Sequence, residues 1–464
     1  MAVQPLLDDT IVALATPPGV GALAILRVSG ADTFRLVNAI FYGADLTKAP
    51  SHTIHLGHIK DEQGRELDEV LTFLFKGPKS YTGEDVIEIS THGSSYIVQE
   101  ILQLLVRKGA RLAGPGEFTL RAFMHGRLDL TQAEAVADLI ASENAAAHAI
   151  AVQQMRGGFS SDIKLLRQEL IDFAALIELE LDFVEEDVEF ADRIKLRNLI
   201  HKILQYIDNL TRSFQLGNVI KEGVSVVIAG RPNAGKSTLL NSLLNEDRAI
   251  VSEIAGTTRD TIEEAINIRG IKFRLIDTAG IREAQDQLEA IGVSKTLQKI
   301  EQSNVLIYVF DVAQLSRDEL LSDLQSLARP DLHLLVVANK MDLNPYQVAE
   351  EYYQEELVSA TNFIPISARH HMNVTFLKDK LYELVVKGDL KLEHTVVTNV
   401  RHLEALQQSA TALRSVLGGL EQNVTHDFLT TDIRQALHHL GTITGEIGTE
   451  DLLDSIFSRF CIGK

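Results

Sequence analysis

Hydrophobic and polar positions change their period along the chain, and these changes predict how it is organised. Up to residue 126, short apolar runs alternate with turn residues, which is typical of an α+β domain. Two of these runs flank the turn-like segment Asp61–Gly64, and the second run ends before the breaker Gly77-Pro78. We therefore predict an antiparallel hairpin within an N-terminal α+β domain of residues 1–126.

A helical period dominates residues 127–220 and returns over residues 386–464. Thr131 and Glu134 have the spacing of a capping box, in which a hydroxyl and a carboxylate each accept from the other residue's backbone amide. We expect this box to open the first long helix and Gly157-Gly158 to interrupt the helices that follow. The two segments are predicted to be halves of one discontinuous helical domain.

Between these halves, residues 221–385 contain short apolar runs separated by helical segments. Such a pattern predicts a mostly parallel sheet with helices on both of its faces. The fold expected for the whole chain is multidomain α/β and α, with an α/β domain inserted into the helical one. The apolar runs begin at Ser225, Phe273, Val305, Leu334 and Phe363.

Composition narrows the class of protein without indicating a function. Of the 464 residues, 45% are hydrophobic and 23% are charged, as in folded globular proteins. The formal net charge of −20 excludes an overall basic surface, so contact with nucleic acid would need a local patch or a partner. Cys461 is the one cysteine, which excludes an intrachain disulfide. Because no apolar stretch approaches about 20 residues and the N-terminus is not leader-like, we expect a cytoplasmic protein without a membrane segment.

Two clusters of titratable residues each allow two interpretations. The acidic segment Glu178–Glu189 has enough carboxylates for a metal or an acid–base pair, although a solvated helix face is the favoured interpretation. His52, His55 and His58 have a spacing that would suit a metal on a helix. On a strand, His55 and His58 point to opposite faces, which disfavours zinc.

The segment Gly230–Ser237 fits the pattern G-x-x-x-x-G-K-[ST] and lies where a strand ends and a helix begins. Its glycines let backbone amides turn toward phosphate oxygens. Lys236 would neutralise the β- and γ-phosphates, and the Ser237 hydroxyl can hold Mg²⁺. The pattern predicts a nucleoside triphosphate site.

Three further motifs follow in the order found in GTPases. Asp277–Gly280 would sense the γ-phosphate, Asn339–Asp342 would recognise the base, and Ser367–Arg369 would support the base pocket. The Asp342 carboxylate can accept from N1–H and from the exocyclic amine of guanine, a donor pair that adenine lacks. We therefore expect GTP as the substrate of a Ras-like P-loop domain. The residues expected to bind GTP are Asn233, Ala234, Gly235, Lys236, Ser237, Thr238, Ser252, Glu253, Ile254, Ala255, Gly256, Thr257, Thr258, Asp277, Thr278, Ala279, Gly280, Asn339, Lys340, Met341, Asp342, Ser367, Ala368 and Arg369.

The water-positioning glutamine of Ras-like proteins is missing, because Ile281 follows the glycine of the second motif. Asn233, together with the switch-like segment Ile254–Asp260, suggests a monovalent cation that supplies the charge of an arginine finger. The alternative is that Asn233 only caps the loop. Arg259 and Arg282 lie in or beside the expected switches, either as finger candidates or as ordinary surface ion pairs.

Further motifs extend the pattern beyond nucleotide binding. They are Ala15–Gly19, Ile25–Gly30, Ser80–Asp85, Pro115–Thr119, Gly256–Asp260 and Phe460–Lys464. With these motifs the chain resembles the bacterial tRNA-modification GTPases of the MnmE family, also called TrmE, over essentially its whole length. The resemblance implies a tetrahydrofolate-binding N-terminal domain, related in fold to the aminomethyltransferase of glycine cleavage, through which the protein forms a homodimer.

The resemblance also implies metal ligands and a water-holding residue in the nucleotide site. Mg²⁺ would be held by Ser237 and Thr258, and Glu289 would hold the attacking water in place of a glutamine. The implied potassium ligands are Asn233, Ser252, Ile254 and Thr257. The residues expected to act in catalysis are Glu289, Asn233, Lys236 and Cys461, the last without an assigned step.

In the N-terminal domain, the resemblance implies that Arg27, Glu84 and Arg127 contact a folate and that Lys464 reaches the same pocket. A pterin ring presents an amidine-like edge to a carboxylate, and cations suit the glutamate tail. The ligand would be a 5-formyl or 5,10-methylene tetrahydrofolate. The sequence has His125-Gly126-Arg127 where the family commonly has Asn-Gly-Lys, and Arg127 retains the charge.

The function implied by the resemblance is potassium-activated GTP hydrolysis coupled to tRNA modification. With an FAD-dependent partner similar to MnmG, in a heterotetramer or a larger complex, the protein would install a carboxymethylaminomethyl or aminomethyl group at C5 of the wobble uridine of certain tRNAs. The alternative is a ribosome-assembly GTPase that binds RNA as a switch without modification chemistry. Such proteins typically append a basic RNA-binding module, whereas this chain ends in helices and the sequence FCIGK.

Overall fold

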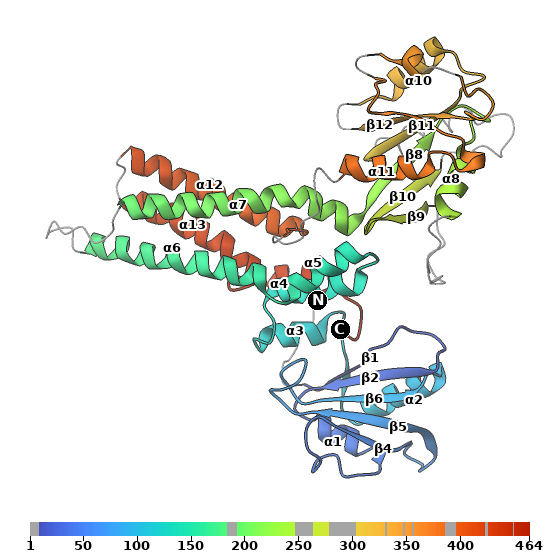
Figure 1. The fold of residues 1–464 in the computed structure, drawn as a ribbon. Coiled ribbons are helices and arrows are strands. Elements are labelled where there is room, and N and C mark those ends of the chain that lie inside the picture. The colour runs from blue at the N-terminus through green and yellow to red at the C-terminus, as the bar shows by residue number, and fades with distance from the viewer. Residues whose placement is uncertain are drawn as a thin grey trace. The chain divides into compact units, whose positions relative to one another are not determined.

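The chain forms two compact units (Figure 1). The first unit comprises residues 1–140, 152–205 and 404–464, and the second comprises residues 141–151 and 206–403. The domain limits expected from the sequence stay a prediction. The computed structural model describes residues 9–182, 193–245, 263–277, 303–329, 332–346, 349–354, 357–385, 396–422, 426–448 and 450–464.

Within its described residues, the first unit contains a seven-stranded sheet in the order β3-β4-β5-β6-β2-β1-β7. Neighbouring strands are antiparallel except for β1 and β7, which are parallel. The predicted hairpin is confirmed, because β4 and β5 pair from Thr53 opposite Leu74 to Lys60 opposite Glu66. The strands are β1 (Ile11–Leu14), β2 (Leu23–Ser29), β3 (Phe41–Tyr42), β4 (Thr53–Lys60), β5 (Glu66–Phe75), β6 (Val86–His92) and β7 (Arg111–Leu112).

Alternation along β2 gives this sheet two different faces. Leu26 and Val28 are fully buried in the core that the sheet forms with helices α1 and α2. Arg27 and Ser29 point to the opposite face, where the Arg27 guanidinium lies over the ring of Phe118 in helix α3. One face therefore supplies the core, and the other presents polar side chains. The helices are α1 (Thr33–Asn38), α2 (Ser95–Arg107) and α3 (Glu117–Met124).

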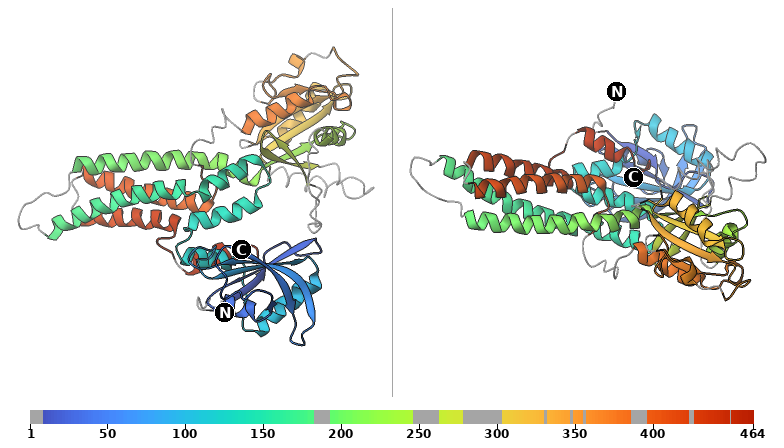
Figure 2. Two further views of the ribbon diagram at one scale, coloured as in Figure 1. Left: turned by 60° about the horizontal axis from the view of Figure 1, so that its bottom comes forward. Right: turned by 90° about the horizontal axis from the view of Figure 1, so that it is seen from above.

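The helical part of the first unit includes α6 and α13, which lie side by side (Figure 2). Helix α5 ends at Met155 and α6 begins at Gly158, so the predicted break is confirmed. Lys202 of α7 forms an ion pair with Glu169 of α6 at 2.9 Å. None of the helices in the described parts of the chain has the length and apolar character needed to cross a membrane. The helices are α4 (Leu130–Ala141), α5 (Ala145–Met155), α6 (Gly158–Asp182), α7 (Arg193–Glu222), α12 (Val400–Glu421), α13 (His426–Thr444) and α14 (Glu450–Phe457). Of these, α4, α5, α7 and α12 each include residues of both units.

The start of α4 corrects one expectation from the sequence. Asp129 and Gln132 form the reciprocal pair, since each side-chain oxygen accepts from the other residue's backbone N–H at 3.0 Å. Thr131, predicted to cap the helix with Glu134, lies inside it, and its buried hydroxyl donates to the Ile443 carbonyl at 3.0 Å. The prediction was wrong by two residues because tertiary contact with α13 uses the hydroxyl that the pattern had assigned to the cap.

The second unit contains a six-stranded sheet among its described residues, in the order β13-β12-β11-β8-β10-β9. All neighbours are parallel except β9 and β10. The mostly parallel sheet is confirmed, although the sequence analysis did not predict the edge strand β9. The strands are β8 (Val224–Ala229), β9 (Glu263–Ile268), β10 (Ile271–Asp277), β11 (Val305–Asp311), β12 (His333–Asn339) and β13 (Phe363–Pro365).

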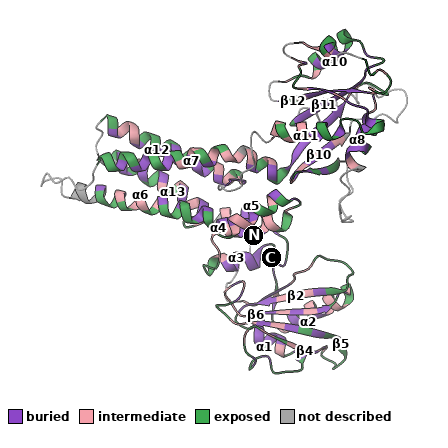
Figure 3. Ribbon diagram, viewed as in Figure 1, coloured by how far each residue is buried: buried purple, intermediate pink, exposed green. Residues whose placement is uncertain are grey.

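Helices cover both faces of this sheet, and the buried positions in Figure 3 follow its strands. Val226 and Ile228 of β8 belong to a core cluster that includes residues of α8 and α11. Val227 lies in a second cluster with Leu320 and Leu324 of α10. The multidomain α/β and α fold class is thus confirmed. The helices are α8 (Lys236–Asn245), α10 (Arg317–Leu327) and α11 (Val374–Val385), with 3₁₀ turns η3 (Ala349–Tyr352) and η4 (Ala368–His370).

Candidate functional sites

The loop between β8 and α8 is Gly230–Ser237, at the strand-to-helix junction that the sequence predicted. Gly230 and Gly235 have φ angles of 148° and 95°. A Cβ on Gly230 would lie 2.0 Å from the Val309 carbonyl oxygen, and one on Gly235 would lie 2.2 Å from Asn339 Nδ2. The loop therefore excludes side chains at both glycines and brings its backbone against the neighbouring strands.

Lys236 begins α8 and is buried. Its ammonium group donates to the carbonyls of Gly230 and Arg231, each at 2.9 Å. Ser237 and Thr238 are exposed in the same first turn. The N-terminus of a helix carries partial positive charge and backbone N–H groups, so this turn is suited to phosphate oxygens.

Asn339 joins three of the predicted motifs. Its side-chain amide donates to the Ala234 carbonyl of the phosphate loop at 2.8 Å, and its Oδ1 accepts from the Ala368 amide at 3.0 Å. The Met341 amide also donates to the Ile366 carbonyl at 3.1 Å. The ends of β8, β12 and β13 thus meet at one edge of the sheet, as expected for an open parallel sheet with a ligand site.

Asp342 lies at this edge with its carboxylate directed by a neighbour. Ser367 Oγ donates to Asp342 Oδ1 at 2.6 Å, and His370 Nε2 lies 3.8 Å from Oδ2. The hydrogen bond from Ser367 lowers the pKa of Asp342, with smaller contributions from His370 and Arg369. The carboxylate is therefore ionised at neutral pH and can accept from two adjacent N–H donors.

Lys340 also belongs to this edge, and its partner was not predicted. Its ammonium group donates to Asp311 Oδ2 at the end of β11, 2.7 Å away. Lys340 has a left-handed backbone with φ of 66°, which turns the chain out of β12. Asp311 had no sequence signal of its own, because it is a single acidic residue after an apolar run.

Other predicted residues of the nucleotide site are placed only in part. Asp277 ends β10, in register with Ile228 of β8. The remaining predicted positions lie outside the described residues, as do Arg259 and Arg282. These positions are Ser252, Glu253, Ile254, Ala255, Gly256, Thr257, Thr258, Thr278, Ala279, Gly280 and Glu289.

On the polar face of the first unit's sheet, Arg27 is surrounded by contacts. Its guanidinium pairs with Glu88 of β6 at 2.8 Å and lies 5.1 Å from the Tyr81 ring centroid and 5.6 Å from that of Phe118. Its Nη1 donates to the Gly463 carbonyl at 3.2 Å. Arg27 of β2 therefore contacts the C-terminal segment at Gly463.

Backbone contacts of Ile462 and Gly463 hold the C-terminal segment in place beside Arg27. Ile462 forms a β-bridge with Pro115, and a Cβ on Gly463 would lie 2.3 Å from the Leu14 carbonyl oxygen. Burial lowers the pKa of Lys464, and the positive charge of Arg27 lowers it further. Cys461 is exposed. Lys464 therefore lies close enough to Arg27 to feel its charge, and a folate site that includes both residues stays a prediction.

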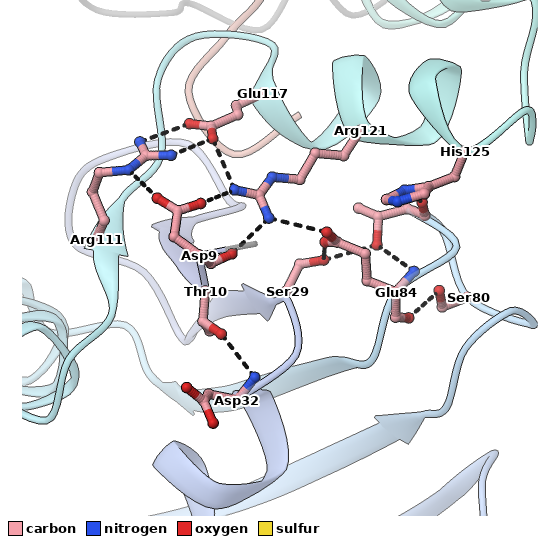
Figure 4. A network of polar contacts seen from close by, with 11 residues as sticks. Asp9, Thr10, Ser29, Asp32, Ser80, Glu84, Arg111, Glu117, Arg121 and His125 are labelled. Carbon is pink, nitrogen blue, oxygen red and sulfur yellow. Dashed lines mark hydrogen bonds and ion pairs between the residues drawn. The ribbon is translucent and has the colours of Figure 1, made fainter. Parts of the chain in front are cut away.

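Arg127 and Glu84 lie in adjacent parts of this face. Arg127 lines an open pocket of about 420 Å³ together with Tyr81, Glu88 and His52. Glu84 lies within a network of polar contacts (Figure 4), where Oε2 accepts from Ser29 at 2.6 Å. The pocket has aromatic walls, a carboxylate and a cation, a combination that suits an aromatic ligand with an anionic tail.

A network of charged residues that was not predicted from the sequence includes Glu84, and two of its members, Arg121 and Glu117, are buried. Arg121 of α3 is fully buried and contacts Asp9, Glu84 and Glu117, the last two at 3.0 and 3.2 Å. Arg111 binds Glu117 at 2.5 Å and Asp9 at 2.6 Å. Burial alone would raise the pKa of Glu117, but hydrogen bonds from Arg111 and the Gly114 amide lower it overall. The spacing of Glu117 and Arg121 was the one sequence signal for this network.

Comparison with known proteins shows full-length similarity to one family. A family model described as the MnmE helical domain matches residues 130–461, and one described as the GTP-binding protein TrmE N-terminus matches residues 10–127. A protein of Cytophaga hutchinsonii named tRNA modification GTPase MnmE is 55% identical over 456 residues, which cover 98% of each chain. The protein of that name in Flavobacterium johnsoniae is 53% identical over 465 residues, covering 98% of this chain and 99% of the other.

Proposed function

The chain belongs to the MnmE family of tRNA-modification GTPases, and from this membership we propose the chemistry of its individual sites. It hydrolyses GTP, and P-loop GTPases bind the nucleotide together with Mg²⁺. We propose that GTP is bound by the residues that the four nucleotide motifs predict, from Asn233 of the phosphate loop to Arg369 of η4. The observation that carries this proposal is Asn339, whose side chain links the phosphate loop to the base-recognition loops.

In this proposal, Lys236 and the first turn of α8 bind the phosphates, and Ser237 and Thr258 hold Mg²⁺. Lys236 is already buried against the loop carbonyls, which favours a fixed position for its ammonium group. Fixed positive charge near the β- and γ-phosphates stabilises the charge that develops on phosphoryl transfer. Asp342 accepts from guanine, and Ser367 keeps its carboxylate ionised and directed.

We further propose that K⁺ supplies the charge for which other GTPases use an arginine finger. Its ligands would be Asn233, Ser252, Ile254 and Thr257, and Glu289 would hold the attacking water. Asn233 supports this proposal because it is exposed in the phosphate loop with a left-handed backbone, φ 63°. Asparagine is among the residues that adopt this conformation at least cost.

Potassium dependence tests the hydrolytic part of the proposal. GTP turnover in KCl should exceed turnover in NaCl at equal ionic strength, and the Asn233→Ala variant should lose most of that difference. The Asn233→Asp variant keeps an oxygen at the same place and serves as the matched control, which should retain it. Equal rates of GTP turnover by the wild-type protein in the two salts would contradict a role for K⁺ in hydrolysis.

For the modification half, we propose that Arg27, Glu84, Arg127 and Lys464 bind a 5-formyl or 5,10-methylene tetrahydrofolate, with Cys461 acting beside it. The contact between Arg27 and the Gly463 carbonyl supports one pocket built from both ends of the chain. Acting as a cytoplasmic homodimer with an FAD-dependent partner, the protein would then install a carboxymethylaminomethyl or aminomethyl group at C5 of the tRNA wobble uridine. Full-length similarity to proteins named for tRNA modification favours this over ribosome assembly without modification.

A further inference from the structure

None of the Arg121 side chain is exposed. Its guanidinium lies among Asp9, Glu84 and Glu117 (Figure 4). Its Nη1 donates to the Asp9 carbonyl at 2.8 Å and to Glu84 Oε1 at 3.0 Å, and its Nη2 donates to Glu117 at 3.2 Å and to the Asp9 carboxylate. Burying a guanidinium is unfavourable unless it is paired in this way. These hydrogen bonds fix the position of the Arg121 guanidinium and of the carboxylates that pair with it.

Glu84 is held from two sides. While Arg121 occupies Oε1, Ser29 Oγ donates to Oε2 at 2.6 Å, and Ser29 in turn lies 2.8 Å from Thr82 Oγ1. About a tenth of the Glu84 side chain stays exposed. Each carboxylate oxygen has two acceptor positions, so each retains one after these contacts. The carboxylate thus has a fixed plane and an accessible edge.

The backbone around Glu84 is fastened as well. Ser80 Oγ donates to the Glu84 carbonyl at 2.5 Å, and the Glu84 amide donates to Thr82 Oγ1 at 3.2 Å. The Thr82 carbonyl lies 2.9 Å from Nδ1 of His125, near the end of α3. These hydrogen bonds restrict rotation of both the main chain and the side chain of Glu84. A group that binds planar donors is expected to be fixed in this way.

We propose that Arg121 and Ser29 are positioning residues that fix the Glu84 carboxylate for the amidine-like edge of a reduced pterin. This inference rests on the proposed folate site. Because Arg121 is fully buried, it cannot touch the ligand itself and acts only through Glu84. Two parallel N–H donors of a pterin pair best with a carboxylate whose plane is set before binding, since ordering it on binding would reduce affinity.

The chain offers a matched control in Arg111. Arg111 contacts Asp9 and Glu117, which it shares with Arg121, but the described contacts of Glu84 do not include it. Substituting lysine at either arginine keeps the charge and removes the planar donor fork. Both variants disturb the same network of charges. Only Arg121→Lys alters a hydrogen bond to the Glu84 carboxylate.

The experiment measures binding to the full-length protein by calorimetry with two ligands. 5-Formyltetrahydrofolate carries the pterin edge, and p-aminobenzoylglutamate carries only the tail half. For Arg121→Lys, the dissociation constant for 5-formyltetrahydrofolate should rise roughly tenfold, the scale of one hydrogen bond to a charged group, with the constant for p-aminobenzoylglutamate unchanged. Arg111→Lys should change neither constant by more than about twofold. Thermal melting of each variant reports any general loss of stability separately.

Ser29→Ala provides a second test that leaves every buried charge paired. It should weaken 5-formyltetrahydrofolate severalfold and spare p-aminobenzoylglutamate, so it decides the matter if Arg121→Lys does not fold. Wild-type affinity for 5-formyltetrahydrofolate in both Ser29→Ala and a folded Arg121→Lys would overturn the inference, as would equal losses for both ligands. Failure of the wild-type protein itself to bind 5-formyltetrahydrofolate would overturn the folate site, and the positioning role with it.

Discussion

At the scale of single residues, the proposed recognition of guanine depends on the Asp342 carboxylate, which Ser367 orients. Asp342 accepts from Ser367 through one oxygen, and the side chain stays partly exposed. An aspartate offers only acceptors to the ligand, whereas an asparagine of the same shape offers one acceptor and one donor group. Shape alone therefore cannot preserve guanine recognition at this position.

Asp342→Asn should reverse the base preference. The amide can accept from only one of the two guanine donors and presents an N–H to the other, so affinity for GTP should fall by at least about tenfold. Xanthosine triphosphate, with a carbonyl in place of the amine, should gain relative to GTP. Competition binding with the two nucleotides measures the ratio, and Asp379→Asn, an exposed carboxylate of α11, is the control. An unchanged ratio would show that the base pocket lies elsewhere.

At the scale of elements, helix starts show how tertiary contact overrides a local pattern. The sequence from Asp129 to Glu134 holds two overlapping candidate boxes, Asp129 with Gln132 and Thr131 with Glu134, and spacing cannot choose between them. In the structure Thr131 bonds to a carbonyl more than 300 residues away, which leaves Asp129 to cap. The helix was predictable, but its first residue was not.

Asp129→Ala should therefore destabilise the first unit by about 1–2 kcal/mol, because an N-cap acceptor is lost. Asp129→Asn keeps an acceptor at the same place and should cost much less. Asp129 also accepts from Ser160 at 3.0 Å and pairs with Lys164 at 3.2 Å, so the asparagine variant separates capping from charge. Chemical denaturation of the two variants makes the comparison. Equal losses of stability in the two variants would mean that Asp129 stabilises the fold through its ion pair with Lys164 and not through the cap.

The buried network that links the segment before β1 with β7 and α3 predicts a pH dependence. The folded-state pKa of Glu117 lies below its ordinary value of 4.5, and that of Asp9 lies below 3.8. A carboxyl with a lowered pKa contributes stability that is complete above the ordinary value and is lost as the pH falls through the folded value. The first unit should therefore lose stability progressively as the pH falls below about 5.

Unfolding of the protein by denaturant between pH 7 and pH 3 measures this slope. In Glu117→Gln one of the two titrating carboxyls is absent, so the variant should be less stable at neutral pH and show a shallower decline. Parallel curves for wild type and variant would mean that Glu117 does not contribute through its charge. The surface pair of Glu62 and Lys108 offers a control, because Glu62→Gln should leave the slope nearly unchanged.

At the scale of the whole molecule, the sequence predicts features that neighbouring residues encode and misses those that distant residues build. The phosphate loop was predictable because its glycines, lysine and serine lie in one short segment, Gly230–Ser237. The edge strand β9 was missed because Glu263–Ile268 has no continuous apolar run. Arg121 and Asp9 are 112 residues apart, and no periodicity relates them. Arg27 and Gly463 are 436 residues apart, and no local pattern predicted their contact; the family resemblance implied only that Lys464 reaches the pocket of Arg27.

We propose that this chain modifies the wobble uridine of tRNA through a folate site to which its own C-terminus contributes. The most direct measurement is mass spectrometry of tRNA nucleosides from cells that lack the gene, complemented either with the full chain or with a chain ending at Phe460. Ending there retains Phe460, which packs with Phe457 in the core. GTP turnover of the purified truncated protein reports whether its nucleotide site has folded.

The full chain should restore the 5-carboxymethylaminomethyl or 5-aminomethyl uridine. The truncated chain should not restore it, even where its GTP turnover shows that the nucleotide site has folded. In the truncated chain Arg27 loses the Gly463 carbonyl to which it donates, and Lys464 is absent from the proposed folate site. Normal levels of modified uridine in cells with the truncated chain would contradict the account.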